Sequence, residues 1–250
     1  MTGALFYVMG FSRGRPLFNN EDTLAWVPVD QRATLAYSFI DTLADLHVLD
    51  PDAVGLGSLG KKEDYIGRQI KAWYRSWESS IEFAQLDDPR AHEFKAFFLA
   101  NQPAQVTASV VHGDYYLHNC LFSEASKVSA VLDWELATLG DPLADLGYTL
   151  RAWPEIDDDP FLEPTAPTAV SGLPLRGELA QRYSERTGFP VDLLDYYVGF
   201  NHWKTAAILH GVYARYQAGQ KSSEGVDLEA LKDGILKGLA GSERAILRLQ

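Results

Sequence analysis

The chain has 250 residues, 46% of them hydrophobic and 12% aromatic, which is enough apolar material for a full globular core. Its formal net charge of −12 argues against a nucleic-acid partner, because nucleic-acid binding requires a cationic surface. No apolar run approaches the roughly 18 residues that a membrane span needs, and the first residues lack the features of a signal peptide. The single cysteine, Cys120, builds no disulfide framework, so we expect a cytoplasmic location and a buried thiol.

The first recognisable element is a short apolar run, Leu5 to Met9, rich in residues that favour β-structure. It ends at Gly10, and the polar and basic residues that follow, through Pro16, are typical of a turn. On local grounds alone, the segment is interpreted as an edge strand with its turn.

Three amphipathic helices are expected next, over residues 30–50, 63–83 and 89–101. In each, apolar side chains recur at the three-to-four spacing of a buried face. Asp30 is placed to cap the first helix. His47, near the end of that helix, is interpreted as a packed, hydrogen-bonded residue rather than a catalyst.

The second of these helices carries an aromatic stripe that includes Trp73 and Trp77, with basic residues interleaved. Such a stripe fits a wall of an acceptor-substrate site, although its spacing favours a core face. Upstream of it, residues 55–60 spell the pattern GxGxxG. No strand leads into this pattern, so we interpret it as a loop and not as a phosphate-binding motif.

An antiparallel hairpin is expected at the centre of the chain. One apolar run ends at Val111, a second covers residues 120–122, a polar turn follows, and a third covers residues 128–132. Short runs of β-formers around a polar turn are typical of a hairpin.

The open end of this hairpin gathers polar side chains. With the turn centred between residues 125 and 126, Asn119 lies across the ladder from Leu132, next to Asp133. An amide oxygen and a carboxylate suit Mg²⁺, which takes one or two protein carboxylates together with phosphate oxygens. Asp114, on the loop beside them, stays free to accept a proton from a nucleophile.

A further helix is predicted after the hairpin, because Asp141 followed by Pro142 is a strong helix-start signal. Asp145 lies one turn later on an otherwise apolar face, where a carboxylate requires partners. The next stretch, residues 153–175, contains five prolines and is expected to be a long loop. Its acidic residues fit a solvated surface or, as the sharper alternative, a lid over the acceptor site.

The C-terminal part is expected to be helical over residues 178–188, 192–217 and 226–249, with Gly188 as the first helix's C-cap. The middle helix is apolar on most sides, so it should be largely buried. Its polar and aromatic residues are candidates for the acceptor site, although packed histidines are commoner. They are His202, Trp203, Lys204 and His210.

Asp114, Asn119 five residues later and Asp133 after a hairpin form the phosphoryl-transfer layout of kinase-like enzymes. The pattern H-x-D-x-x-x-x-N from His112, followed by LDWE, resembles the aminoglycoside phosphotransferase and choline kinase family. The phrase LDWELATLGDPLADLGY, with GLGSLGKKEDYIGRQIKAWYRSWE upstream, is similar to one subgroup in particular. That subgroup is the phosphotransferase domain that some proteins carry fused to an acyl-CoA dehydrogenase.

The resemblance implies an α+β, mainly α fold, namely the C-terminal lobe of a protein-kinase-like fold with a short catalytic β-hairpin. By the same resemblance, Asp114 is the catalytic base, and Asn119 and Asp133 are the Mg²⁺ ligands. His112 and Asp145 are then expected to support the catalytic loop. The implied cofactors are ATP and Mg²⁺, and the implied partner is a small molecule with a hydroxyl group.

The resemblance also implies where the nucleotide binds. The hinge that holds adenine through backbone groups is expected at Gly10 to Ser12, with Met9 behind it. Leu121 and Leu132, on the hairpin, are expected to form the floor of the adenine site.

Kinase-like enzymes also need a phosphate-covering loop and a strand lysine before the hinge, whereas only four residues precede the first strand here. We therefore expect residues 1–16 to be the remnant of an N-terminal lobe and residues 17–250 to be the helical C-terminal lobe. By this interpretation, the chain is a fragment or begins downstream of the true start. Its first strand is expected to be mobile or to pair with another chain, which would cause self-association.

Three functions fit these features to different degrees. An ATP- and Mg²⁺-dependent phosphotransferase is favoured, and a catalytically incomplete kinase-like binding or interaction lobe is the alternative. A metal-dependent hydrolase built on His112, Asp114 and Asp133 is weaker, because no further histidine or carboxylate falls at ligand spacing. For the acceptor, the resemblance to the subgroup suggests a hydroxyacyl thioester, whereas the negative net charge of the chain suggests an amine.

Overall fold

The computed structural model describes residues 10–155 and 164–250. The predicted strand Leu5–Met9, including the adenine-site residue Met9, lies outside these residues, as does part of the acidic loop after Trp153. The helices are α1 Asn20–Trp26, α2 Arg32–His47, α3 Tyr65–Ala84, α4 Pro89–Ala100, α5 Pro142–Leu150, α6 Arg176–Thr187, α7 Leu194–Gln217 and α8 Leu228–Arg248. The strands are β1 Ser109–Val111, β2 Cys120–Phe122, β3 Val128–Val131 and β4 Thr138–Gly140.

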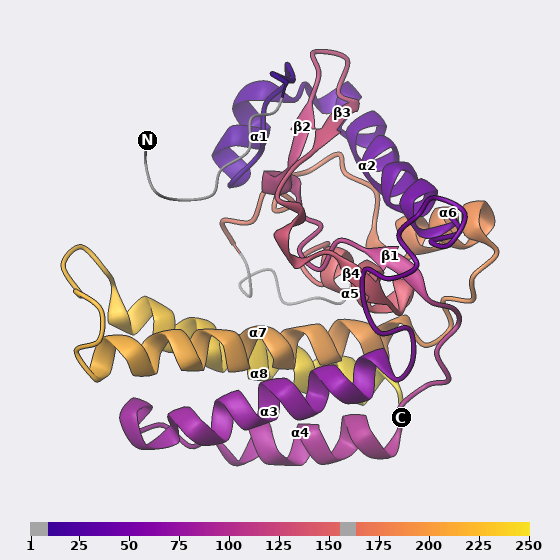
Figure 1. Cartoon of the computed structure of the whole chain (residues 1–250). Coiled ribbons are helices and arrows are strands. Elements are labelled where there is room, and N and C mark those ends of the chain that lie inside the picture. The colour runs from indigo at the N-terminus through magenta and orange to yellow at the C-terminus, as the bar shows by residue number, and fades with distance from the viewer. Residues whose placement is uncertain (1–9, 156–163) are drawn as a thin grey trace, which may run out of the picture.

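Helices α3, α4, α7 and α8 lie together in one layer, and Figure 1 shows α2, α6 and the β2–β3 hairpin on the other side of β1, β4 and α5. Helix α7 is the centre of that layer, because it packs against α3, α4, α5 and α8. It is buried on most sides, as its sequence predicts. No helix in the described ranges combines the length and the apolarity needed to cross a bilayer.

Two antiparallel strand pairs frame the central segment. The predicted hairpin is present, with Cys120 opposite Val131 in the ladder. The expected register is confirmed, because the amide of Leu132 donates to the carbonyl of Asn119 at 2.8 Å. Strand β1 pairs with β4, and this second pair closes the loop that contains the hairpin. Strand β4 was not predicted, because it is three residues long and depends on a partner far away in the chain.

The structure confirms some of the predicted helix ends and contradicts others. Asp141 caps α5 as predicted, with its carboxylate accepting from the amide of Leu143 at 3.0 Å. Gly188 ends α6 in the left-handed region, as predicted. The predicted Asp30 cap is wrong: residues 29–31 form a 3-10 turn, and α2 begins after them without a side-chain cap. Helix α1 was not predicted, although Asn19 caps it.

The remaining elements agree with the expected α+β, mainly α class, which is confirmed. Residues 55–60 lie in turns, so the GxGxxG pattern is a loop as interpreted. Cys120 is fully buried among the apolar residues of the core, as expected for a structural thiol. Burial raises the pKa of this thiol to about 12, so the group is inert at neutral pH.

Candidate functional site

The loop after β1 turns sharply at Gly113, which has φ +84°. An added Cβ at this position would lie 2.9 Å from the carbonyl oxygen of Leu136, so a side chain is excluded by both strain and space. The turn directs His112 inward and leaves the Asp114 side chain 25% exposed. Glycine is therefore needed between these two residues for them to face opposite environments.

Asp145 of α5 lies beneath this loop and is almost completely buried. Its carboxylate accepts from the backbone amides of His112 at 2.7 Å and Gly113 at 3.0 Å. The Nε2 of His47 donates to the same carboxylate at 3.3 Å, and the Tyr183 hydroxyl bonds the other ring nitrogen at 2.6 Å. Burial favours a raised pKa for Asp145, but these donors outweigh burial and lower the pKa.

His112 is fixed by two hydrogen bonds of its ring. Its Nε2 donates to the carbonyl of Leu132 at 2.8 Å, and its Nδ1 accepts from the amide of Asp114 at 3.3 Å. The ring is therefore the neutral tautomer with hydrogen on Nε2. Since Leu132 precedes Asp133, this bond ties the loop of Asp114 to the end of the hairpin.

The Asp114 carboxylate is held at both oxygens. The Tyr148 hydroxyl donates to one oxygen, and the Asn119 amide donates to the other at 3.0 Å. Asn119 also donates to the backbone carbonyl of Asp114 at 2.9 Å. His118 lies 4.0 Å away from the carboxylate. The carboxylate therefore has a fixed orientation and remains partly open to solvent, which a proton acceptor requires.

Asn119 and Asp133 leave oxygen atoms available at the end of the hairpin. The Asn119 amide nitrogen is used on Asp114, and its Oδ1 accepts no hydrogen bond from the described residues. Asp133 is exposed, its carboxylate has no hydrogen bond or ion pair within the described ranges, and its backbone is left-handed at φ +63°. Such backbone conformations cluster at functional sites. Two adjacent unused hard oxygens fit a Mg²⁺ ion that also binds phosphate.

The expected hinge leads directly to the hairpin. Gly10 and Ser12 are exposed, and the chain just after them, at Arg15, forms an antiparallel bridge with Phe122 of β2. Gly14 packs so closely that an added Cβ would lie 2.8 Å from the Cβ of Leu121. The segment that follows the hinge therefore lies against one of the two predicted floor residues. Both floor residues, Leu121 and Leu132, are half-buried.

Of the six candidate acceptor-site residues, four are corrected by the structure, because they pack against core neighbours: Trp77, His202, Trp203 and His210. Trp77 is 1% exposed and its ring stacks on His210 at 3.9 Å, so both ring faces belong to the core. Trp203 is equally buried, and its indole donates to the carbonyl of Ala91 at 2.9 Å. His202 faces α8, where it packs against Gly241. Helix α7 has helices on several sides, so residues next to one another along it face different neighbours.

Another candidate, Trp73, is half-buried, with its indole donating to Gln69 at 2.8 Å. Its role in a substrate site stays a prediction. No group of three or more His, Cys, Asp or Glu in the described ranges has ligand geometry, so the structure adds no support to the metal-hydrolase alternative. In addition, both nitrogens of the His112 ring are already used.

Sequence reasoning missed two residues near Asp114, Tyr148 and Arg151. Tyr148 lies on the face of α5 that the sequence predicts to be apolar, yet its hydroxyl bonds Asp114. The Arg151 guanidinium lies 4.1 Å from the Tyr148 ring centroid, and the Lys204 ammonium lies 5.5 Å from it. The only sequence signal for Tyr148 is its place one turn after Asp145 on the same helix.

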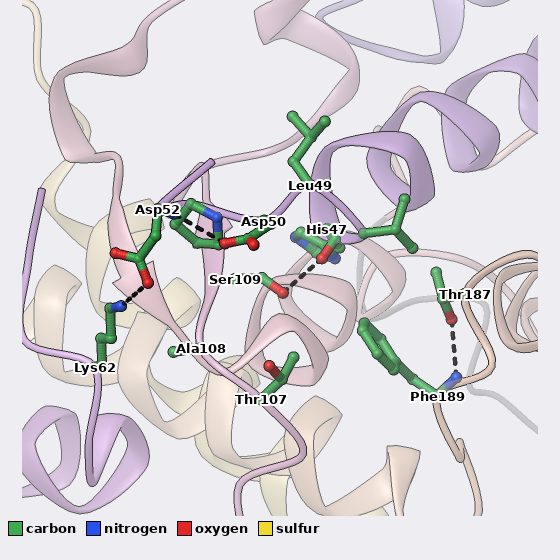
Figure 2. Close-up of a pocket in the computed structure, with 12 residues that line it drawn as sticks. His47, Leu49, Asp50, Asp52, Lys62, Thr107, Ala108, Ser109, Thr187 and Phe189 are labelled. Carbon is green, nitrogen blue, oxygen red and sulfur yellow. Dashed lines mark hydrogen bonds and ion pairs between the residues drawn. The ribbon is translucent and has the colours of Figure 1, made fainter. Parts of the chain in front are cut away.

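A separate surface pocket of about 490 Å³ lies near the ends of α2 and α6 (Figure 2). No residue of the catalytic loop or hairpin lines this pocket. Figure 2 shows its polar groups already paired: Lys62 bonds Asp52 at 2.6 Å, and the Ser109 hydroxyl donates to the His47 carbonyl at 2.6 Å. The pocket is therefore distinct from the site around Asp114.

Comparison with known proteins agrees with this geometry. The model of the phosphotransferase enzyme family matches residues 2–173. Acyl-CoA dehydrogenase family member 10 from Mus musculus is 34% identical over 228 residues, covering 88% of this chain and 21% of that protein. The chain thus spans about a fifth of the length of this curated relative.

Solved structures show the same fold. A Ralstonia eutropha protein assigned to the aminoglycoside phosphotransferases has a TM-score of 0.77 and 27% identity, over 94% of this chain and 71% of that one. Choline kinase from Cryptosporidium parvum has a TM-score of 0.59 at 12% identity, over 95% of this chain and 70% of that one, and supports the fold alone. The kinase-like fold and the resemblance inferred from the His112 to Asp133 motifs are confirmed, and the chain belongs to the phosphotransferase enzyme family.

Proposed function

We propose that this protein transfers the γ-phosphoryl group of ATP, in the presence of Mg²⁺, to a hydroxyl group of a small molecule. The observation that carries the proposal is the grouping around the hairpin's open end. There, the oriented carboxylate of Asp114 lies beside two side chains, Asn119 and Asp133, whose oxygens have no other use in the described residues.

Asp114 has the role of the base in this proposal. As the acceptor's oxygen bonds to the γ-phosphorus, the bond from that phosphorus to the bridging oxygen breaks and ADP leaves. The hydroxyl proton passes to Asp114, whose orientation is set by Tyr148 and Asn119. Fixed orientation matters because catalysis in this class consists mainly of positioning and charge stabilisation.

Asn119 and Asp133 would hold Mg²⁺, which neutralises charge on the phosphate oxygens when it is bound. The unused Oδ1 of Asn119 and the carboxylate of Asp133 support this assignment. The hydrogen bond between the Asn119 carbonyl and the Leu132 amide, at 2.8 Å, keeps the two ligands adjacent. The hairpin therefore brings both residues to one place before any ion binds.

For the nucleotide, we propose that the backbone of Gly10 to Ser12 receives adenine above Leu121 and Leu132, with Met9 behind. The contact between Gly14 and Leu121 supports this, since it brings the chain that follows the hinge to the hairpin. We further propose that residues 1–16 belong functionally to the N-terminal side of the fold and residues 17–250 to the C-terminal lobe. A cytoplasmic location fits the use of ATP.

For the acceptor, we propose a hydroxyl on an acyl thioester. The support is the match to a relative named as an acyl-CoA dehydrogenase family member. The chain covers only 21% of that relative, so the proposal concerns the acceptor of this domain alone.

The test is a transfer assay with Mg²⁺ and ATP, in which ADP release and the phosphorylated acceptor are both measured, the latter by mass spectrometry. A hydroxyacyl-CoA and an aminoglycoside are supplied in parallel. The assay is run on the 250-residue chain and on the same chain extended by any residues that precede it in its gene. Phosphorylated hydroxyacyl-CoA supports the proposal. Nucleotide binding without transfer by either chain would instead favour a non-catalytic interaction lobe.

A further inference from the structure

Helix α7 contacts α5 through one residue per turn. The Tyr197 hydroxyl donates to Asp141 at 3.0 Å, at the start of α5. The Asn201 amide donates to the Ala144 carbonyl at 2.8 Å. The next residue on the same face of α7 is Lys204, whose ammonium lies 5.5 Å from the Tyr148 ring centroid. This register brings Lys204 to the end of α5 that carries the partner of Asp114.

Among the described residues, Lys204 is a largely buried cation with no ion-pair partner. Only 9% of the residue is exposed, and its ammonium makes no hydrogen bond or ion pair with the described residues. By contrast, the preceding residues on this face, Tyr197 and Asn201, both have hydrogen-bond partners. A largely buried cation is costly when no oxygen atom pairs with it, so Lys204 favours an oxygen from outside the described residues.

A second cation, Arg151, lies on the same Tyr148 ring as Lys204. The guanidinium of Arg151 lies 4.1 Å from the same ring and donates to the Tyr148 carbonyl at 2.7 Å. The pKa of Lys204 is lowered to about 8, mainly by burial and also by the charge of Arg151, while the charges of Asp145 and Asp114 oppose the shift. The ammonium is therefore still mainly charged at neutral pH, in a chain whose net charge is −12.

We propose that Lys204 is a specificity-determining residue of the acceptor site, and that its ammonium binds a carbonyl or carboxylate oxygen of the acceptor while Asp114 receives the acceptor's hydroxyl. This inference rests on the proposed function, since it assumes that Asp114 faces the acceptor. The ligand oxygen supplies the acceptor that the buried ammonium lacks. An amine at the same place meets a like charge, so amino alcohols are rejected.

The test compares three matched four-carbon acceptors in the Mg²⁺- and ATP-dependent assay. They are 3-hydroxybutyrate with a carboxylate, 3-hydroxybutyramide with a neutral carbonyl, and 4-amino-2-butanol with an amine. The wild-type protein is expected to prefer the first two by at least about 10-fold in kcat/KM, the size of one hydrogen bond to a charged group. Comparison of the first two identifies which oxygen is bound.

Lys204→Met is expected to lower kcat/KM for the preferred acceptors by about 10–100-fold and to remove the preference over the amine. Lys204→Arg keeps a cation and is expected to retain part of the preference. Lys237→Met is the matched control, because Lys237 is a surface residue of α8 paired with Asp233 at 2.7 Å. Circular dichroism establishes that each variant is folded. An unchanged order of the three acceptors in Lys204→Met overturns the inference.

Binding separates this inference from the proposed function. If the wild-type protein transfers phosphate to none of the three, Kd values from NMR titration decide the role of Lys204, and the hydroxyacyl-CoA assay separately decides the proposed function. Tighter binding of 3-hydroxybutyrate than of 4-amino-2-butanol, lost in Lys204→Met, supports an oxygen-binding site at Lys204. Equal binding of both molecules to both proteins overturns it.

Discussion

Aspartate side chains on the two sides of the loop from His112 to Asn119 have opposite environments. Behind the loop, Asp145 is buried and receives three hydrogen bonds, from His47 and from two backbone amides. In front of the loop, Asp114 is partly exposed, and Asp133 is exposed with no partner in the described residues. Asp145 accepts three hydrogen bonds out of contact with solvent, whereas Asp114 accepts two at a partly exposed carboxylate and Asp133 accepts none from the described residues.

This difference distinguishes an aspartate that holds the backbone in place from aspartates that can take part in a reaction. A carboxylate that already accepts from several fixed donors has its lone pairs occupied and serves to hold backbone in place. A carboxylate with open oxygens can take a proton or a metal ion. The front side also contains the non-glycine residue Asp133 in a left-handed conformation, at φ +63°. The energetic cost of that conformation is offset by the rigid hydrogen bonds behind it.

The sharpest test of the front side is Asp114→Asn. Asparagine keeps the shape of the side chain but cannot take the acceptor's proton. We expect phosphoryl transfer to fall by about 10²–10⁴-fold, the usual contribution of a general base, while nucleotide affinity is retained. Transfer rates and nucleotide titrations measure the two quantities. Asp233→Asn on the surface of α8 is the control. A wild-type rate in Asp114→Asn would remove this residue from the mechanism.

The matching test of the rear side is Asp145→Ala, which should act on folding. It leaves the buried His47 and the amides of His112 and Gly113 without their acceptor. We expect a loss of about 3–5 kcal/mol in the free energy of unfolding, measured by urea denaturation. Because folding lowers the pKa of Asp145, its stabilising effect is present above the ordinary value of 3.8 and is lost as the pH falls below it.

The control for Asp145→Ala is Asp45→Ala on the outer face of α2. Asp45 pairs with Arg186 at 2.6 Å, but its side chain is 57% exposed. We expect this substitution to cost less than about 1 kcal/mol, as exposed ion pairs generally do. Equal losses in the two variants would contradict the view that Asp145 is the support of the loop.

A third test concerns the proposed metal ligands, Asn119 and Asp133. Substitution of residues that only support metal ligands typically lowers metal affinity by roughly 10–100-fold, and we use this range as the scale for the ligands themselves. We expect Asp133→Ala to reach the upper end of that range for Mg²⁺-dependent nucleotide binding, because it removes a charge. Asn119→Ala should lie near the lower end, because it removes a neutral oxygen. Calorimetry with and without Mg²⁺ measures both effects. Identical affinities in both variants and the wild-type protein would show that the hairpin does not bind the metal.

The sequence was sufficient where the structure depends on neighbours in the chain. Asp141 with Pro142 predicted the start of α5, and the polar turn predicted the hairpin register, because caps and turns are local. The paired motifs identified the family. The burial of Trp77 could not be predicted, because the aromatic stripe on α3 has the same spacing whether it faces a substrate or the core. The stacking of Trp77 on His210 of α7 shows that it faces the core.

The acceptor side of the site was the least predictable part. Lys204 was among the candidates on its helix, but so were His202 and Trp203, which face α8 and α4. Only the register between α5 and α7 distinguishes them, because it directs Lys204 toward Tyr148. Such a register follows from the packing of two distant helices, and no local pattern specifies it.

The last test measures the free energy of unfolding, to distinguish a role of Lys204 in folding from a role in ligand binding. Folding lowers the pKa of Lys204 from 10.5 to about 8, mainly because the residue is buried. This shift corresponds to at most roughly 3 kcal/mol against the charged form. The penalty is fully present below pH 8, shrinks as the pH rises through the folded value and is gone above the unfolded value near 10.5. Lysine at this position therefore destabilises the free protein at neutral pH.

Lys204→Met should therefore be more stable than the wild-type protein by about 1–2 kcal/mol at pH 7, because methionine fills a similar space without a charge. The difference in unfolding free energy between the two proteins should narrow between pH 8 and pH 10, because Lys204 loses its proton in the folded state. Urea denaturation at several pH values measures the gap, and Lys237→Met should show none. If Lys204→Met were less stable at pH 7, Lys204 would be a structural residue. A gain in stability together with a loss of acceptor preference would show that Lys204 serves ligand binding rather than folding.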